Sequence, residues 1–339
     1  MEKTMTTTTH NKTPGMVVLV ATIAGLVLAA ISLLPLGPGH SALGVAFDTE
    51  ADEAAEADKQ EAPKALRGIH YDPPRQAPAL DGLDHNGQSF SLKRQPHPLA
   101  MVFFGYVSCT DVCPTNLKKF EKIQKQLGAD ADQVQFVFVT IDPGNEPPKK
   151  MAEYLEYYEG EIIGVTGPYG DSLDEVYKSW GIVRKRVELD KPVMGRDYKF
   201  DHSGQIYLVQ NGKKMPVSYP YGTSVDTMVE DLSALLDDPS LGERLPEVGS
   251  VKKVTIPPGS YTRAAQKNPK LPAYLRVRVG DSIRWRNDDY MYHFVGDISL
   301  GPGEEATQRF DEAGEFYFGC TALPSEVIRI AVEEPSTDG

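Results

Sequence analysis

The most apolar stretch of the chain lies close to its N-terminus. Residues Met16 to Leu36 are almost wholly apolar, and no Asp, Glu, Lys or Arg occurs between Lys12 and Asp48. About 20 apolar residues are enough to cross a bilayer as a helix. The run is longer than the apolar region of a signal peptide and has no clean cleavage site after it. We therefore expect a retained transmembrane anchor over residues 16–36.

The charges on either side of this segment predict its orientation. Lys3 and Lys12 precede it, whereas an acidic stretch follows between Asp48 and Glu61. The positive-inside rule then places residues 1–15 in the cytoplasm. We expect a single-pass protein of the cell inner membrane, with its main domains on the periplasmic side. Residues 37–77 are expected to be an acidic linker and lead-in.

Apolar runs and amphipathic stretches alternate in the middle of the chain and are typical of an α/β layered domain over residues 78–238. Before them, residues 70–96 are rich in Pro, Gly and Asp and predict loops. Buried strands are predicted at residues 99–107, 134–141, 162–165 and 205–209. Helices are predicted to begin at Pro114 and to span residues 148–158, 173–180 and 225–236.

The pattern changes after residues 239–250, which are rich in Pro, Gly and charge and predict a linker. Apolar Leu275, Val277 and Val279 alternate with arginines, and Ile283 and Trp285 do the same. Alternation of this kind, interrupted by Gly turns, is typical of strands. Residues 251–335 are therefore predicted to form a small all-β sandwich or barrel.

Composition narrows the possible functions. The 339 residues are enough for about two domains. With 35 Lys and Arg against 48 Asp and Glu, the net charge is −13, which argues against a nucleic-acid partner. Three cysteines are too few for a disulfide scaffold, and two of them lie four positions apart. This spacing indicates a functional site.

Cys109 and Cys113 lie where the first predicted strand meets its helix, which is where open α/β sheets place their sites. Unpaired N–H groups at the start of a helix stabilise a thiolate. Two thiolates can bind a soft ion such as Cu(I), or they can close into a disulfide. The alternative is a pair of buried, inert cysteines.

Three motifs resemble the SCO/SenC family, the thioredoxin-like copper chaperones of cytochrome c oxidase assembly. Residues 104–114 (FGYVSCTDVCP) are similar to the family's signature loop, and residues 140–143 (TIDP) to its strand-end aspartate motif. Residues 197–209 resemble its histidine-bearing loop and following strand. The resemblance implies a thioredoxin-like fold and one copper ion bound by Cys109, Cys113 and His202. Asp142 either orients this site or only begins a turn.

The resemblance implies a membrane-anchored chaperone that delivers copper to the copper-bearing subunit of cytochrome c oxidase during its assembly. The alternative is a thiol–disulfide oxidoreductase, in which the Cys109–Cys113 dithiol reduces the client's copper-site cysteines. Whether the protein is an enzyme therefore stays open, and the sequence does not predict its oligomeric state. A thioredoxin would have CxxC spacing, and a peroxiredoxin would have Pro and Ser or Thr in place of Val102 and Tyr106. His85 and His97 are expected to be solvated loop residues.

Residues 279–289, His293 and residues 314–320 resemble a cupredoxin, a fold in which the His and Cys would be copper ligands. A blue-copper site also needs a second imidazole after the cysteine and commonly a weak axial Met. Leu323 and Ile328 stand at those positions. We therefore expect a cupredoxin-like scaffold without metal, in which Cys320 is a core residue. The alternatives are a transient copper site of His293, Cys320 and Met291, or a module that docks the partner oxidase.

Overall fold

The computed structural model describes residues 65–167, 173–245, 249–262 and 271–334. The predicted anchor at residues 16–36 lies outside these ranges. Within them, no helix is long and apolar enough to cross a membrane.

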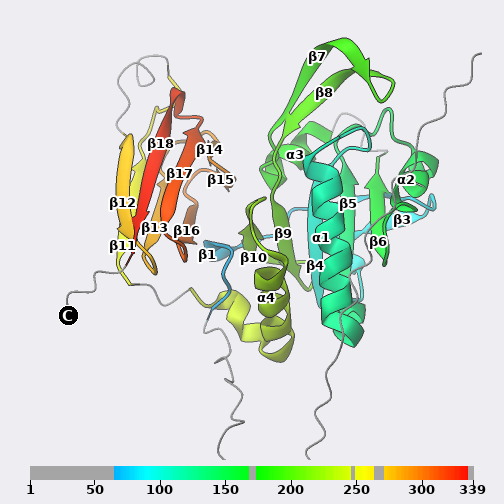
Figure 1. The fold of residues 1–339 in the computed structure, drawn as a ribbon, viewed down its shortest axis with the longest axis horizontal. Helices are drawn as coiled ribbons and strands as arrows, with labels where there is room; N and C mark the ends of the chain where they lie inside the picture. The colour runs from blue at the N-terminus through cyan, green and yellow to red at the C-terminus, as the bar shows by residue number, and fades with distance from the viewer. Residues whose placement is uncertain (1–64, 168–172, 246–248, 263–270, 335–339) are drawn as a thin grey trace, which may run out of the picture. The chain divides into compact units, whose positions relative to one another are not determined.

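The centre of the α/β part is a sheet of buried strands (Figure 1). Strand β4 (Leu99–Gly105) pairs in parallel with β5 (Val134–Thr140), which pairs in parallel with β6 (Ile162–Thr166). On its other side β4 pairs antiparallel with β9 (Ile206–Gln210), and β9 pairs with β10 (Lys214–Tyr219). Strands β4, β5 and β9 are buried along their whole length, which explains their uninterrupted apolar sequences.

Helices cover both faces of this sheet. Helix α1 (Val112–Leu127) packs on one face, where the rings of Phe120 and Phe136 are 5.2 Å apart. Helix α3 (Leu173–Trp180) packs on the other face, where the ring centroids of Trp180 and Phe104 are 5.3 Å apart. Figure 1 shows α4 (Val225–Asp237) beside α1, and α2 (Pro148–Leu155) precedes β6. The predicted α/β layering is confirmed.

The prediction of loops over residues 70–96 is wrong in part. This segment contains β1 (Ile69–Gln76), β2 (Asp81–Asp84), β3 (Ser89–Ser91) and a short 3-10 helix, Leu92–Arg94. Pro73 and Pro74 lie inside β1, but its pairing with β10 shifts register between His70 and Arg75. The prolines therefore occupy the irregular part of the strand, where a missing N–H is tolerated.

A long hairpin was not predicted. Strands β7 (Arg184–Val193) and β8 (Arg196–His202) pair with each other and form a separate two-stranded sheet. Most side chains of β7 are exposed and many are charged, so the segment has no apolar run that would indicate a strand. This hairpin matters for function because β8 ends at His202.

The C-terminal part consists of strands, as its alternating sequence predicts. One group is β11 (Val251–Ile256), β13 (Ser282–Asn287) and β16 (Glu305–Arg309). A five-stranded sheet contains β12 (Tyr274–Arg278), β14 (His293–Val295), β15 (Ile298–Leu300), β17 (Gly314–Cys320) and β18 (Leu323–Glu333). Ile283 and Trp285 are fully buried, in agreement with the period of two.

Strand β1 forms hydrogen bonds with strands from both parts of the chain. It pairs with β10 on one side and with β16 on the other, where His70 lies opposite Thr307. The buried guanidinium of Arg75 in β1 donates to Glu304 and Ser299.

Within the predicted linker, residues 239–243 form a 3-10 helix that buries Leu241. The division into domains at residues 78–238 and 251–335 stays a prediction.

Candidate metal centre

The two cysteines lie on either side of the start of helix α1. Cys109 precedes the helix, where its N–H donates to the carbonyl of Tyr106 at 3.1 Å. Cys113 is in the first turn, and its N–H donates to the Cys109 sulfur at 3.5 Å. The thiols form no disulfide. Cys109 is partly exposed whereas Cys113 is fully buried, so an approaching molecule meets Cys109 first.

The structure brings His202 to this pair. Its Nε2 lies 3.6 Å from the Cys113 sulfur and 4.0 Å from the Cys109 sulfur. The three ligand atoms all lie within 4.8 Å of one another. In the described part of the chain, no other group of three or more His, Cys, Asp or Glu ligand atoms is as compact. The three residues predicted to bind the ion are thus neighbours in space, and their binding of metal stays a prediction.

The hydrogen bonds of His202 direct its free lone pair toward the sulfurs. Its Nδ1–H donates to the Ser203 carbonyl at 2.8 Å, because a carbonyl can only accept. In the neutral ring Nε2 is then unprotonated, which is the form that binds metals. In the protonated ring Nε2–H donates to the Cys109 thiolate instead. Buried Asn116 of α1 fixes the same loop by donating to the Gly204 carbonyl at 2.8 Å. Sequence reasoning missed Asn116, because its sequence position gave no sign of this contact.

The two thiols differ in acidity. Hydrogen bonds from Cys113, from His202 and from the backbone N–H groups of Asp111 and Cys113 outweigh burial and lower the pKa of Cys109 to about 4. Burial, together with the hydrogen bond to Cys109, raises the pKa of Cys113 well above its ordinary value. The outer sulfur is therefore a thiolate at neutral pH, and the inner one is a thiol.

Close packing surrounds the three ligands. The ring of Tyr106 meets that of His202 edge-to-face at 5.6 Å, and the Tyr106 hydroxyl accepts a hydrogen bond from the N–H of Phe200. A Cβ at Gly105 would lie 2.6 Å from the Cys113 sulfur and 2.8 Å from the Phe138 ring. Only glycine at position 105 leaves the sulfur of Cys113 in this place.

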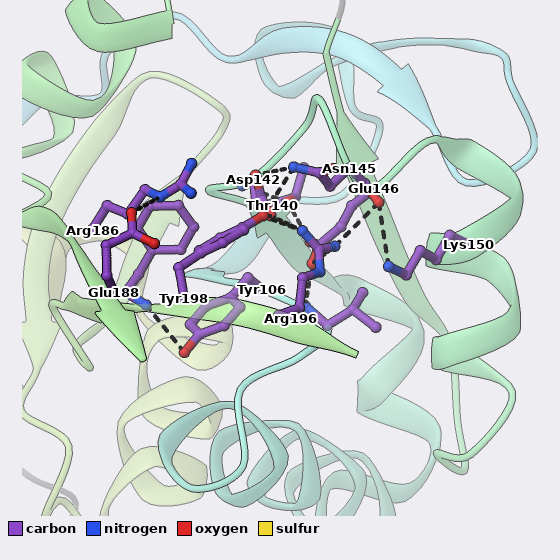
Figure 2. A network of polar contacts seen from close by, with 12 residues as sticks. Tyr106, Thr140, Asp142, Asn145, Glu146, Lys150, Arg186, Glu188, Arg196 and Tyr198 are labelled. Atoms are coloured by element: carbon purple, nitrogen blue, oxygen red, sulfur yellow. Dashed lines mark hydrogen bonds and ion pairs between the residues drawn. The ribbon is translucent and has the colours of Figure 1, made fainter. Parts of the chain in front are cut away.

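In the described part of the chain Asp142 forms no hydrogen bond with the three ligands, but it does more than begin a turn. It is buried, and its carboxylate accepts hydrogen bonds from Arg196, Tyr198 and Asn145 (Figure 2). Arg196 and Tyr198 belong to β8, the strand that ends in His202. Asp142 therefore connects the end of β5 to the hairpin that carries the histidine.

In the C-terminal part, His293 uses both ring nitrogens for hydrogen bonds. It is 1% exposed, with Nε2 2.8 Å from the Asp289 carboxylate and Nδ1 3.2 Å from the Thr321 hydroxyl. Burial alone would raise the pKa of Asp289, but hydrogen bonds from His293 and two backbone N–H groups lower it. Both ring nitrogens of His293 are therefore occupied by hydrogen bonds in this arrangement. The scaffold without metal and the transient copper site both stay predictions.

The two remaining loop histidines lie outside the centre. His85 is partly buried, and its Nδ1 accepts a hydrogen bond from the N–H of Gly164 at 3.0 Å. The prediction that His85 is only solvated is therefore wrong, because it caps the edge of β6. His97 lies in the loop before β4 and is also partly buried.

The known proteins that resemble this chain match it over only part of its length. A SCO2-like protein of Rickettsia conorii is 33% identical over 138 residues, which are 40% of this chain and 66% of that protein. A putative copper-binding protein of Stutzerimonas stutzeri is 33% identical over 136 residues, 40% of this chain and 64% of that protein. The chain thus spans slightly less than two thirds of the length of these relatives.

Two solved structures are similar over about half of the chain. Copper-bound ScoI of Bradyrhizobium japonicum is 27% identical, with a TM-score of 0.42, and the match covers 47% of this chain and 98% of that one. Apo Sco1 of Thermus thermophilus is 24% identical, with a TM-score of 0.44, and the match covers 50% and 97%. The family model of SCO1/SenC matches residues 72–237. Residues 72–237 are therefore a SCO1/SenC domain, with a thioredoxin-like fold.

Proposed function

We propose that this chain is a copper chaperone whose cargo ion is bound by Cys109, Cys113 and His202. The observation that carries the proposal is the cluster of two sulfurs and one imidazole nitrogen within 4.8 Å. Soft sulfur ligands select Cu(I), and imidazole also suits copper. The printed name of the Stutzerimonas stutzeri relative, a putative copper-binding protein, supports the same cargo.

The geometry suits an ion that must later be released. Three ligands leave copper with a low coordination number, so that a client's ligand can join before one of the chaperone's ligands leaves. Cys109 is the partly exposed ligand, so ligand exchange with a client would begin at its sulfur. Binding at Cys113 requires the loss of its thiol proton, so loading is coupled to proton release.

The copper-bearing subunit of cytochrome c oxidase is the client that the resemblance of the three motifs supports. The predicted anchor at residues 16–36 would hold the chaperone beside this membrane-bound client. The site would then lie on the periplasmic side of the inner membrane.

A thiol–disulfide oxidoreductase is the second candidate, and the asymmetry of the two thiols favours it. The Cys109 thiolate would attack a client disulfide, form a mixed disulfide and release one client thiolate. Cys113, after losing its proton, would attack the Cys109 sulfur and release the second client thiolate. The client gains two electrons, and Cys109–Cys113 becomes the disulfide.

His202→Ala in the full-length chain separates the two functions. It removes a copper ligand and is expected to weaken Cu(I) binding by at least about 100-fold, more than the loss of an outer partner. Exchange of the dithiol with a small disulfide should change by less than about threefold, because both sulfurs remain. His97→Ala is the matched control and should change neither property. Wild-type affinity for Cu(I) in His202→Ala would contradict the proposed ligand set.

A further inference from the structure

The hairpin that carries His202 cannot hold its own position. Among the described strands, β7 and β8 pair only with each other. An isolated two-stranded hairpin is at best marginally stable in water. His202 is nevertheless placed within 4.0 Å of both sulfurs. Contacts between the hairpin and the rest of the domain must therefore fix the histidine.

Those contacts lie on one face of β8. Because successive side chains of a strand alternate, Arg196, Tyr198, Phe200 and His202 share a face. Tyr198 is 8% exposed and Phe200 is 5% exposed, whereas the three intervening residues are exposed. His202 is thus the last of four side chains along a face that packs against the domain.

The first two side chains of this face bind a pair of acidic residues (Figure 2). Arg196 donates to the Asp142 carboxylate at 2.6 Å, and the Tyr198 hydroxyl donates to the same oxygen. Arg196 also lies 3.8 Å from the carboxylate of Glu146. The side chains of Arg196, Asp142 and Glu146 are 10%, 8% and 0% exposed, so water screens these contacts little.

Glu146 connects this group to the cysteine loop. One of its oxygens accepts a hydrogen bond from the backbone N–H of Val107 at 2.9 Å, and the other accepts one from Thr140. Val107 lies two residues before Cys109. The carboxyl group of Glu146 is therefore hydrogen-bonded to the loop that carries Cys109. It also lies 3.8 Å from Arg196, in the strand that carries His202.

We propose that Arg196 and Glu146 are positioning residues for the metal centre, which together hold the His202 strand and the Cys109 loop at a fixed separation. Neither residue binds the ion. The proposal rests on the proposed function in one respect: the centre is taken to bind copper. Arg196 is the informative residue to change, because its loss leaves Asp142 buried without its counter-charge.

The test is the affinity for Cu(I) of the full-length chain, measured by competition with a chromophoric chelator. Arg196→Ala is expected to weaken it by about tenfold or more, as loss of an outer partner of a metal site typically does. Arg196→Lys should recover part of the affinity, since it keeps a charge for Asp142 but cannot form the same planar contacts. Unchanged affinity in Arg196→Ala overturns the proposal.

Lys199→Gln is the matched control. It removes an exposed ion pair with Asp201 (3.2 Å) from the opposite face of the same strand. It should bind Cu(I) with the affinity of the wild type. If its affinity falls as far as that of Arg196→Ala, the proposal is wrong. If Arg196→Ala does not fold, the Cu(I) affinity of Tyr198→Phe is measured instead, because this variant removes only the hydroxyl that donates to Asp142. Wild-type affinity in Tyr198→Phe then overturns the proposal.

A second readout needs no metal. In the metal-free wild type, nuclear Overhauser contacts should join the His202 and Tyr106 rings, whose centroids are 5.6 Å apart. Arg196→Ala should lose these contacts and Lys199→Gln should keep them. If Arg196→Ala keeps them, the positioning proposal is wrong. If the wild type binds no Cu(I), the proposed function fails, and these ring contacts still test the positioning role.

Discussion

The sulfur of Cys113 lies 3.6 Å from Nε2 of His202, although 89 positions separate the two residues in the chain. The cysteine belongs to the junction of β4 and α1, and the histidine ends a hairpin inserted after α3. The dithiol is a local feature of one loop, whereas the three-ligand centre exists only in the folded domain. Copper retention should therefore be more sensitive than thiol chemistry to changes that move the hairpin.

The reactivity of Cys109 should persist at low pH. Its lowered pKa, about 4, means that the thiolate is present above that pH and is lost as the pH falls through it. Alkylation of Cys109 by iodoacetamide should be constant from about pH 6 to 8 and should fall with a midpoint near pH 4. Cys113→Ala should move this midpoint upward, because the Cys113 hydrogen bond is the largest cause of the shift. A wild-type rate that still rises through pH 8 would contradict this assignment.

Gly105→Ala should disturb the metal centre directly. The new Cβ would lie 2.6 Å from the Cys113 sulfur, so the sulfur or the strand must move. Overpacking of this kind lowers the free energy of unfolding by about 1–3 kcal/mol, and we expect Cu(I) affinity to fall by about tenfold. Gly144→Ala is the control, since no atom lies within 4 Å of its Cβ. Urea unfolding and copper competition measure the two effects, and wild-type values for both would refute the steric argument.

His70 should make the fold sensitive to acid. Burial lowers its pKa from 6.5 to about 4, so between these values the unfolded chain binds a proton that the folded chain does not. The contribution of His70 to the free energy of unfolding is therefore present above pH 6.5 and falls by roughly 3 kcal/mol as the pH drops to 4. Urea unfolding at several pH values should show a smaller loss in His70→Gln. Equal pH dependence in the two proteins would show that His70 is not responsible.

His293→Ala should affect stability without affecting copper. It removes the donor to the buried carboxylate of Asp289, and a lost hydrogen bond to a charged group typically costs about 2 kcal/mol. Urea unfolding measures this loss, with His97→Ala as the control. The copper content of the full-length chain should stay unchanged. Loss of a bound copper ion in His293→Ala would instead support a metal site in the C-terminal part.

Much of the α/β architecture could be predicted because its strands are buried on both faces. Strands β4 and β5 begin at the predicted residues and end within two residues of the predicted positions. The Cys pair was recognisable from its spacing and its place at the start of α1. Strand β1 was not predicted because it contains two prolines, which its irregular register tolerates.

The rest of the site depends on contacts that the sequence pattern does not encode. The hairpin residues are mostly exposed and charged, so neither the hairpin nor its contacts with Asp142 could be derived from apolar periodicity. Val107 and Glu146 are 39 positions apart, and Asn116 and Gly204 are 88 apart. His202 could be assigned only through the family resemblance, because chemical reasoning from the residues pointed to the cysteines alone.

The central claim is that one copper ion is bound at the Cys109, Cys113 and His202 cluster. The most direct test is the copper stoichiometry of the reduced full-length chain, measured beside Cys109→Ala and Cys320→Ala. We predict one Cu(I) per chain, lost in Cys109→Ala and retained in Cys320→Ala. A wild-type chain that binds no copper, or an ion that is lost in Cys320→Ala, would contradict the account.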